Sequence, residues 1–212
     1  DFSQHKIEIE NSLKDGKTLL YIAYDGKLLG TIGLSDELRH NAKKSISDLR
    51  KLGVKNIVML TGDTKEKAQT IANELGIDDV KAELLPQDKA KIIKELMLQG
   101  KKVAFIGDGI NDAPALISAH VGISMSRGAD IAKATADISL LKDDIACVVE
   151  AKEYANKTMD LINTNFNATV GINSGILAGA AFGIFSPIVT AVLHNGTTIG
   201  LLLNSIKGVK LK

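Results

Sequence analysis

The sequence contains a single cysteine, no tryptophan and only three prolines in 212 residues. One cysteine excludes an internal disulfide framework, which is typical of a reducing compartment or of the cytoplasmic side of a membrane protein. Cys147 lies in the apolar stretch IACVV, so we expect a buried core residue and not a reactive thiol. The formal net charge of +1 gives no reason to expect nucleic acid as a partner.

A second absence concerns the C-terminal part, because residues 161–206 contain no Asp, Glu, Lys or Arg. As helix this stretch would extend about 69 Å, whereas one bilayer crossing needs roughly 30 Å. Ser186-Pro187 near its middle supplies a break, so the sequence predicts a transmembrane helical hairpin. Lysines flank both ends, which by the positive-inside rule puts both ends in the cytoplasm. The alternative is an apolar helical pair buried in a soluble protein.

Short apolar strands alternate with helices over residues 18–141, which predicts an α/β fold with a doubly wound parallel sheet. The alternation follows an expected hairpin of Thr18–Tyr24 and Lys27–Leu34 around Asp25-Gly26. Residues 1–17 are polar apart from KIEIE, an expected edge strand. The further elements that we predict are strands at 57–60, 80–82, 102–106, 121–125 and 138–141, and helices at 37–52, 65–75, 88–99 and 129–134.

The stretch VAFIGDGINDAPAL, residues 103–116, carries the strongest chemical signal. Gly107 and Gly109 permit a tight turn after a buried strand, and Asp108 and Asp112 follow at the strand's carboxyl end, where open α/β sheets bind ligands. Two hard carboxylates suit Mg²⁺, which otherwise binds waters and phosphate oxygens. For the short GDG motif alone, the alternative is a strand-to-helix turn capped by one of the two aspartates.

Further polar residues are predicted to meet this pair at the same edge of the sheet. Thr61, Gly62 and Asp63 end one strand, and Lys89 lies on a helix. Asn111 could hold a phosphate oxygen or a ligating water. A hydroxyl with backbone N–H groups, a fixed ammonium and Mg²⁺ together stabilise a phosphoryl group during transfer. Taken singly, Thr61 could be a helix cap and Lys89 a solvated surface charge.

The motifs MLTGD, AELLPQDK, GDGINDAPAL, VGISMSRGAD and ADISLL together resemble the C-terminal half of the phosphorylation domain of a P-type ATPase. The heavy-metal (type IB) transporters, which have a haloacid-dehalogenase-like core, are the most similar subgroup. The resemblance implies an ATP-driven heavy-metal cation transporter that uses Mg²⁺, is multi-pass in a membrane, and has a cytoplasmic soluble domain. It divides the chain into 1–17, the tail of a nucleotide-binding domain; 18–158, the phosphorylation domain with stalk; and 159–212, two transmembrane helices and a cytoplasmic C-terminus.

The resemblance also implies roles for individual residues. Thr61 and Asp63 bind the phosphoryl group and position water for dephosphorylation, and Lys89 neutralises the phosphate. Asp108 and Asp112 bind Mg²⁺. The last two spans help to form the ion path through the lipid bilayer, with the plasma membrane as the expected location.

Some features depart from the family pattern. The reaction of P-type ATPases begins at an aspartate in a DKTGT motif, which this sequence lacks. Without that nucleophile we expect the chain to be inactive as an ATPase alone, and because it begins at Asp1 without Met or signal peptide we expect it to be part of a longer protein. Two smaller departures are Thr64, where the family usually has Asn, and Ser126, where it usually has Gly.

Two alternative interpretations of the chain remain. One is a truncated, non-catalytic membrane protein that binds metal or regulates a partner, and the other is a soluble haloacid-dehalogenase-type phosphatase.

Polar groups within the predicted spans are candidates for the ion path. His194 is the only titratable side chain in residues 161–206, and Asn173, Asn195 and Thr197 are the other tentative ligands. Copper transporters of the family have Tyr-Asn and Met-Ser pairs where this chain has Ile172-Asn173 and His194-Asn195. The absence of Met favours a divalent ion such as Zn²⁺, Co²⁺, Mn²⁺, Ni²⁺ or Fe²⁺ over Cu⁺. For any single Asn or Thr, hydrogen bonding between helices is the alternative.

Overall fold

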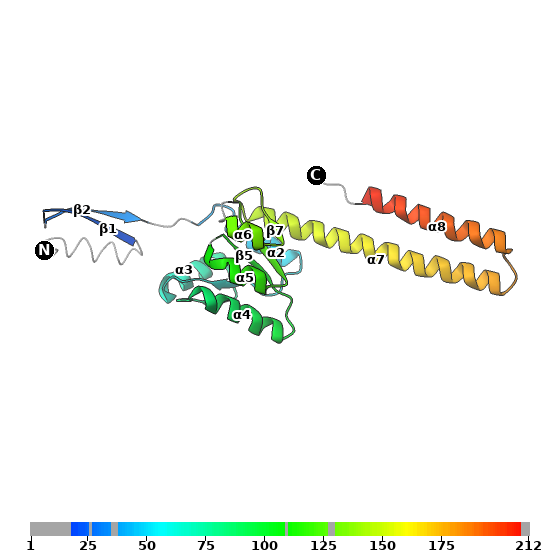
Figure 1. Ribbon diagram of the computed structural model, residues 1–212, viewed down its shortest axis with the longest axis horizontal. Coiled ribbons are helices and arrows are strands. Elements are labelled where there is room, and N and C mark those ends of the chain that lie inside the picture. The colour runs from blue at the N-terminus through cyan, green and yellow to red at the C-terminus, as the bar shows by residue number, and fades with distance from the viewer. Residues whose placement is uncertain (1–17, 26, 35–37, 109, 127–129, 209–212) are drawn as a thin grey trace. The chain divides into compact units, whose positions relative to one another are not determined.

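The computed structural model describes residues 18–25, 27–34, 38–108, 110–126 and 130–208. Its contacts divide the chain into two compact units, which are Asp1–Ser47 with Lys55–Asp143, and Asp48–Val54 with Asp144–Lys212. Figure 1 labels most of the helices and strands of both units. The predicted edge strand at KIEIE lies outside the described residues.

The first unit begins with the predicted hairpin of β1 (Thr18–Tyr24) and β2 (Lys27–Leu34), which pair antiparallel. Asp25 supports the turn by adopting a left-handed φ of 49°, as expected for Asp before Gly. Tyr21 and Ile22 point to opposite faces of the ribbon and are 42% and 43% exposed. Neither face of this two-stranded ribbon is therefore well covered.

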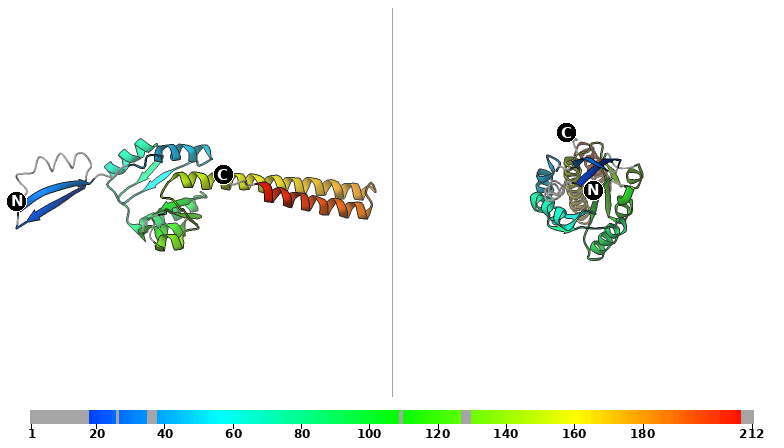
Figure 2. Two further views of the ribbon diagram at one scale, coloured as in Figure 1. Left: turned by 90° about the horizontal axis from the view of Figure 1, so that it is seen from above. Right: turned by 90° about the vertical axis from the view of Figure 1, so that its left-hand side faces the viewer.

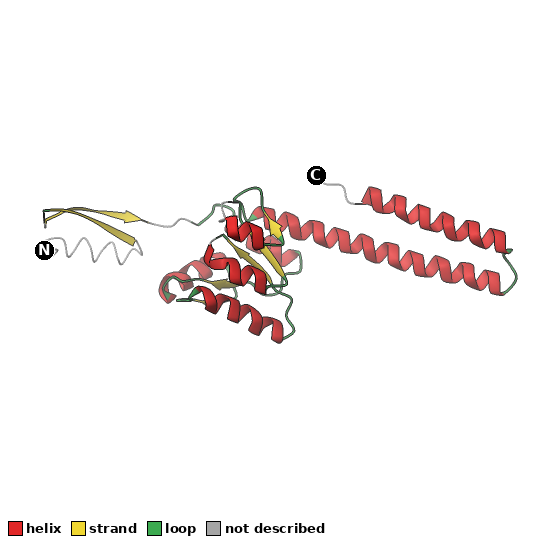
Figure 3. Cartoon of the chain, viewed as in Figure 1, coloured by secondary structure: helices red, strands yellow, loops and turns green. Residues whose placement is uncertain are grey.

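Strands and helices then alternate as the sequence predicts, except that the short helix Ala113–Ser118 was not predicted. Figure 3 shows the helices packed around the short strands. The order is α2 (Ala42–Lys51), β3 (Val58–Leu60), α3 (Lys65–Leu75), β4 (Asp79–Lys81), α4 (Pro86–Leu98), β5 (Ala104–Gly107), the 3₁₀ turn η2 (Ile110–Asp112), α5 (Ala113–Ser118), β6 (Val121–Ser124), α6 (Asp130–Thr135) and β7 (Ile138–Ser139).

The pairing of these strands differs from the single doubly wound sheet that we predicted. β3 pairs in parallel with β4, and β5, β6 and β7 form a separate parallel sheet. Within the described part of the chain, no ladder joins the two sheets. Hydrophobic patterns identify strands but not their neighbours, so the sequence could predict the parallel direction and not this division.

Helix ends follow local signals, and the largest difference from a predicted boundary has a local cause. α2 begins at Ala42, five residues later than predicted. Asn41, a preferred N-cap residue, accepts the first-turn hydrogen bond of Ser45 N–H at its carbonyl, at 2.9 Å. α3 ends where predicted, because Gly76 adopts the left-handed conformation with φ 70°.

The core of the first unit lies between helices and parallel strands. Ile93 of α4 and Leu116 of α5 are each 1% exposed. A Cβ on Gly122 of β6 would lie 2.7 Å from the Leu116 carbonyl oxygen, so this close approach of strand and helix requires glycine. α5 is thereby fixed against β6, and α4 packs on α5.

The second unit contains two long helices, α7 (Ala146–Ala181) and α8 (Pro187–Gly208), which run side by side (Figures 1 and 2). The break at Ser186-Pro187 is confirmed, with Gly183 in the left-handed conformation before it. Cys147 is half-buried in the first turn of α7, so the predicted buried position is wrong.

α7 and α8 pack together as two helices, whereas a transmembrane hairpin stays a prediction. Asparagines recur along both helices and lower their mean hydropathy. Among the residues that the structure describes, no helix combines the length and apolarity of a membrane span.

Candidate functional site

Asp112 lies at the centre of the site, in the turn that follows β5. Its residue is 7% exposed, and both carboxylate oxygens have partners. The Lys89 ammonium donates to Oδ1 at 2.8 Å, and the Asp108 backbone N–H donates to Oδ2 at 3.3 Å. Asp112 occupies the N-cap position of α5, but its side chain makes no capping hydrogen bond. The alternative interpretation, in which Asp112 serves only as a helix cap, is therefore wrong. Its carboxylate instead accepts the hydrogen bond of the Lys89 ammonium.

The last residue of β5 makes room for this carboxylate. A Cβ on Gly107 would lie 2.7 Å from the Cβ of Asp112 and 3.0 Å from its Oδ2. Any side chain at this position would displace Asp112 from its contact with Lys89. The first glycine of the GDGIND motif is thus required by close packing.

Lys89 is fixed by the first turn of α4. Pro86 opens this helix, and the Asp88 carboxylate accepts the Leu85 backbone N–H at 3.0 Å. The Lys89 side chain is 17% exposed and reaches Asp112 across 23 residues of sequence. The alternative of a solvated surface charge is therefore wrong.

Thr61 and Asp63 form a second polar group directly after β3. Thr61 Oγ1 donates to Asp63 Oδ2 at 2.9 Å and accepts the Asp63 backbone N–H at 3.1 Å. Lys67 Nζ lies 3.8 Å from Asp63 Oδ1. A Cβ on Gly62 would lie 3.4 Å from a carbonyl oxygen of the facing loop, so the loops are in close contact here.

Backbone hydrogen bonds tie this loop to the residues just before α4. Glu83 N–H donates to the Asp63 carbonyl at 2.9 Å, and Leu84 N–H donates to the Thr61 carbonyl at 3.0 Å. Glu83 has a left-handed φ of 57°, unusual for a residue other than Gly or Asn. A continuous set of contacts thus runs from Thr61 and Asp63 through this bend to Lys89. The sequence motif AELLPQDK marks this segment, but nothing in it indicated the bend at Glu83.

The side chains of Asp108 and Asn111 are exposed, and in the described part of the chain neither makes a hydrogen bond or ion pair. Asp108 therefore offers both carboxylate oxygens next to the buried carboxylate of Asp112. One or two carboxylates are the donors that Mg²⁺ takes before waters and phosphate oxygens complete its shell. The described residues contain no group of three or more His, Cys, Asp or Glu side chains that could form a fuller metal cage. The donor set fits Mg²⁺.

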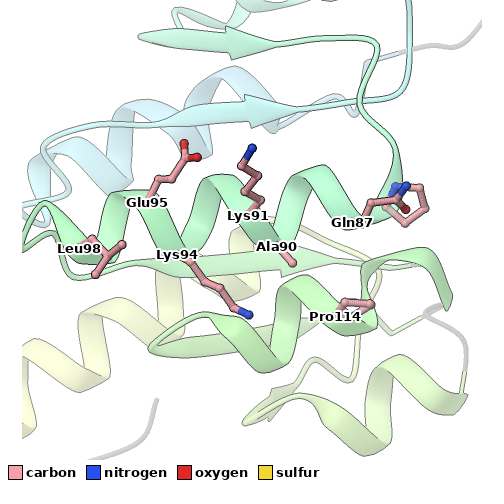
Figure 4. Close-up of a pocket in the computed structure, with 8 residues that line it drawn as sticks. Gln87, Ala90, Lys91, Lys94, Glu95, Leu98 and Pro114 are labelled. Atoms are coloured by element: carbon pink, nitrogen blue, oxygen red, sulfur yellow. The ribbon is translucent and has the colours of Figure 1, made fainter.

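A groove of about 590 Å³ lies along the other face of α4. Figure 4 shows Ala90, Lys94 and Leu98 along one side of this helix, with Pro114 on the neighbouring helix. At about 100° per residue, Ala90, Lys94 and Leu98 lie about 100°, 140° and 180° around the helix from Lys89. None of the polar residues of the cluster lines the groove.

In the helical hairpin, the structure brings together two of the four tentative ion ligands. His194 Nδ1 on α8 lies 3.0 Å from Asn173 Oδ1 on α7. Thr197 Oγ1 donates to the Leu193 carbonyl of its own helix at 2.8 Å. Asn195 is exposed, and its side chain makes no contact of this kind within the described residues.

Residues 3–120 match the haloacid dehalogenase-like hydrolase family. The chain belongs to this family. This haloacid dehalogenase-like chain is 39% identical over 206 residues to a manganese-exporting P-type ATPase of Mycobacterium tuberculosis, covering 96% of the chain and 29% of that protein. It is 38% identical over 215 residues to a probable cadmium-transporting ATPase of Staphylococcus aureus, covering 99% and 30%.

Among solved structures, this haloacid dehalogenase-like chain is similar to a zinc-transporting PIB-type ATPase in its E2·Pi state, with a TM-score of 0.82 and 34% identity. The match covers 99% of the chain and 34% of that protein. The resemblance to heavy-metal P-type ATPases is confirmed by these relatives. The chain spans about a third of their length or less.

Proposed function

We propose that this chain is the C-terminal part of an ATP-driven exporter of divalent heavy-metal cations. The observation that carries the proposal is the contact of Lys89 with the buried carboxylate of Asp112, directly beside the exposed carboxylate of Asp108. Fixed opposite charges at the carboxyl ends of parallel strands suit the binding of a phosphoryl group. The relatives named as metal-exporting and metal-transporting ATPases support the coupling of this chemistry to transport.

In this proposal each residue acts on a phosphoryl group that ATP donates to an aspartate outside the chain. Thr61 and the backbone beside Gly62 hold phosphoryl oxygens, and Asp63 positions the water for dephosphorylation. Lys89 neutralises phosphate charge and is oriented by Asp112. Asn111, exposed beside the pair, binds a phosphoryl oxygen or a water. Bound Mg²⁺, held by Asp108 together with Asp112, would supply further neutralisation of phosphate charge.

The division of the parallel strands supports an external source for the nucleophile. β3 leads into Thr61-Gly62-Asp63 and β5 leads into the Asp108 turn, yet no ladder joins these two strands in the described residues. We propose that a parallel strand from outside this chain lies between them. Its carboxyl end would then bring an aspartate to the same edge of the sheet.

The domain division stays as proposed from the resemblance, with 1–17 as the tail of a nucleotide-binding domain, 18–158 in the phosphorylation domain and 159–212 as the membrane part. The poorly covered faces of the β1–β2 hairpin support a further partner for that ribbon as well.

For α7 and α8 we propose a membrane hairpin with both ends in the cytoplasm and with His194 and Asn173 lining the ion path. Imidazole and amide donors suit Zn²⁺, Mn²⁺ and similar divalent ions and lack the soft sulfur that Cu⁺ prefers. Their contact across the two helices, at 3.0 Å, supports a shared site.

The test is metal-stimulated ATP hydrolysis and metal uptake by inverted membrane vesicles that contain the complete gene product. We expect stimulation by one or more of Zn²⁺, Mn²⁺ and Cd²⁺ above that by Cu⁺. For His194→Ala we expect the preference between Zn²⁺ and Mn²⁺ to change by about tenfold, since even outer-shell changes alter metal binding that much. Vesicles in which no metal stimulates hydrolysis would contradict the transport function. An unchanged metal preference in His194→Ala would mean that His194 contributes only to the packing of the two helices.

A further inference from the structure

The bend between β4 and α4 has a backbone conformation that its residues do not favour. Glu83 lies at this bend with a left-handed φ of 57°, which residues with a Cβ rarely adopt. Such conformations persist where the surrounding structure imposes them, and they are common at functional sites. We infer that Glu83 is a positioning residue for dephosphorylation, and that its backbone, not its carboxylate, sets the place of Asp63 relative to Lys89. The inference rests on the proposed function.

Hydrogen bonds from the bend hold both ends of the loop that follows β3. The β3–β4 ladder continues past its last pair, where Thr61 N–H donates to the Lys81 carbonyl at 3.0 Å. In a regular parallel ladder, Glu83 N–H would donate next, to the Thr61 carbonyl. Leu84 N–H donates there instead, at 3.0 Å, and Glu83 N–H donates to the Asp63 carbonyl at 2.9 Å. The left-handed residue thus shifts the pairing by one residue and adds a contact to Asp63.

The same bend leads directly into the helix that carries Lys89. The Asp88 carboxylate accepts the Leu85 backbone N–H at 3.0 Å and fixes the first turn of α4 just after the bend. Lys89 follows this turn and donates to Asp112 at 2.8 Å. A bend of different shape would therefore displace the loop after β3 and leave this ion pair in place.

The side chain of Glu83 does not account for its left-handed conformation. It is exposed, and among the residues that the structure describes it makes no hydrogen bond or ion pair. Glycine adopts this conformation without steric cost, whereas β-branched residues adopt it least readily. Glycine at this position should therefore preserve the bend, and valine should distort it. A role of the carboxylate predicts equal effects, since both substitutions remove it.

The two sides of the bend serve different steps of the proposed reaction. Lys89 and the carboxylates of Asp108 and Asp112 stabilise the phosphoryl group during its transfer, whereas Asp63 positions the water that removes it. A distorted bend should therefore slow dephosphorylation more than phosphorylation, so the phosphoenzyme should accumulate. Loss of folded protein would instead lower both steps together.

The experiment measures the decay of phosphoenzyme in membrane vesicles that contain the complete gene product. The protein is labelled with radioactive ATP and Mg²⁺, and the label is followed after excess unlabelled ATP is added. We expect Glu83→Val to slow the decay by at least about tenfold, since small displacements of reacting groups have effects of this size. Its phosphoenzyme level should equal or exceed that of the unchanged protein. Glu83→Gly and Glu83→Gln should decay as the unchanged protein does.

Asp25→Val is the matched control, because Asp25 also has a left-handed φ, of 49°, in the turn of the β1–β2 hairpin. This substitution should lower thermal stability, as Glu83→Val does, and leave the decay of phosphoenzyme unchanged. Glu83→Thr, which is β-branched and, unlike valine, polar, repeats the test if Glu83→Val forms no phosphoenzyme.

Three outcomes are distinguishable. Slow decay in Glu83→Val, with normal decay in Glu83→Gly, Glu83→Gln and Asp25→Val, supports the role of the bend. Normal decay in Glu83→Val, or equally slow decay in any of the other three variants, contradicts it. The proposed function then stands, because phosphoenzyme still forms. A complete protein that forms no phosphoenzyme contradicts the proposed function and the inference together.

Discussion

The two polar regions of the molecule differ in charge. In the first unit, the cluster after β3 and β5 is built from carboxylates and a lysine, with Asp112 almost fully buried. In the second unit, the seam between α7 and α8 contains amides, hydroxyls and one histidine. Fixed charges suit the stabilisation of a phosphoryl group, whereas neutral donors suit a cation that must bind and leave. In the function that we propose, phosphate chemistry and ion passage therefore belong to separate units of the chain.

The two regions are also held in place differently. Backbone hydrogen bonds and the close contact at Gly107 fix the charged cluster. The seam depends on side chains that face each other across two helices, with Gly179 packed under Phe185. Substitutions in the first region should therefore be more damaging than those in the second.

The largest effect is expected at the carboxylate pair. Asp112→Asn in the complete protein should lower Mg²⁺-dependent ATP turnover by about a thousandfold, because the charge that orients Lys89 and helps to hold Mg²⁺ is lost. Asp108→Asn should have a comparable effect. Turnover is measured as phosphate release in membrane vesicles.

Asp79→Asn is the matched control, because Asp79 is an exposed aspartate whose ion pair with Lys81 lies outside the cluster. It should keep full turnover. Unchanged turnover in both Asp112→Asn and Asp108→Asn would contradict the assignment of these two carboxylates to the phosphoryl site.

A smaller effect is expected on stability when the lysine is removed. Lys89→Met leaves the Asp112 carboxylate buried without its ammonium partner, which should cost about 3 kcal/mol of the free energy of unfolding. Urea unfolding of the chain in detergent, followed by circular dichroism, measures the change. Lys91→Met on the exposed face of the same helix should change stability by less than about 0.5 kcal/mol. Equal effects of the two variants would mean that the buried pair does not stabilise the first unit.

The smallest effect is expected on stability, when either of two glycines of the helical hairpin is replaced by alanine. A Cβ on Gly175 of α7 meets open space, so Gly175→Ala should stabilise the helix by about 0.5 to 1 kcal/mol. A Cβ on Gly179 would collide with the Phe185 ring, and Gly179→Ala should destabilise the hairpin by about 1 to 3 kcal/mol. Thermal unfolding of the chain in detergent compares them. Stabilisation by both substitutions would show that α7 and α8 do not pack as described.

Local signals determined how much of the fold could be predicted. Asp25-Gly26 fixed the hairpin and Gly76 the end of α3, because each requires a particular backbone conformation. The start of α2 was missed, since several polar residues precede it and Asn41 is one of several competing caps. Which strands pair is a long-range property, and the separation of β3 from β5 has no local signal.

In the candidate site too, the sequence predicted local features but not all of the contacts between distant segments. The motifs indicated that Lys89 and Asp112 meet near a strand end, and the structure brings them into contact. The bend at Glu83, which ties the two loops together, was missed because Glu gives no sign of a left-handed conformation. Likewise, the hydrogen bond between Asn165 and Asn204 depends on the register of α7 against α8, which has no local signal in the sequence.

The measurement that tests the central claim most directly is to locate the phosphorylated residue. The complete gene product is incubated with radiolabelled ATP, Mg²⁺ and the transported metal, and the hydroxylamine-sensitive phosphopeptide is identified by mass spectrometry. We predict an aspartyl phosphate outside these 212 residues and no labelling of the 212-residue chain alone. An aspartyl phosphate on any aspartate within the chain would contradict the claim that its site is completed by a strand from elsewhere in the protein.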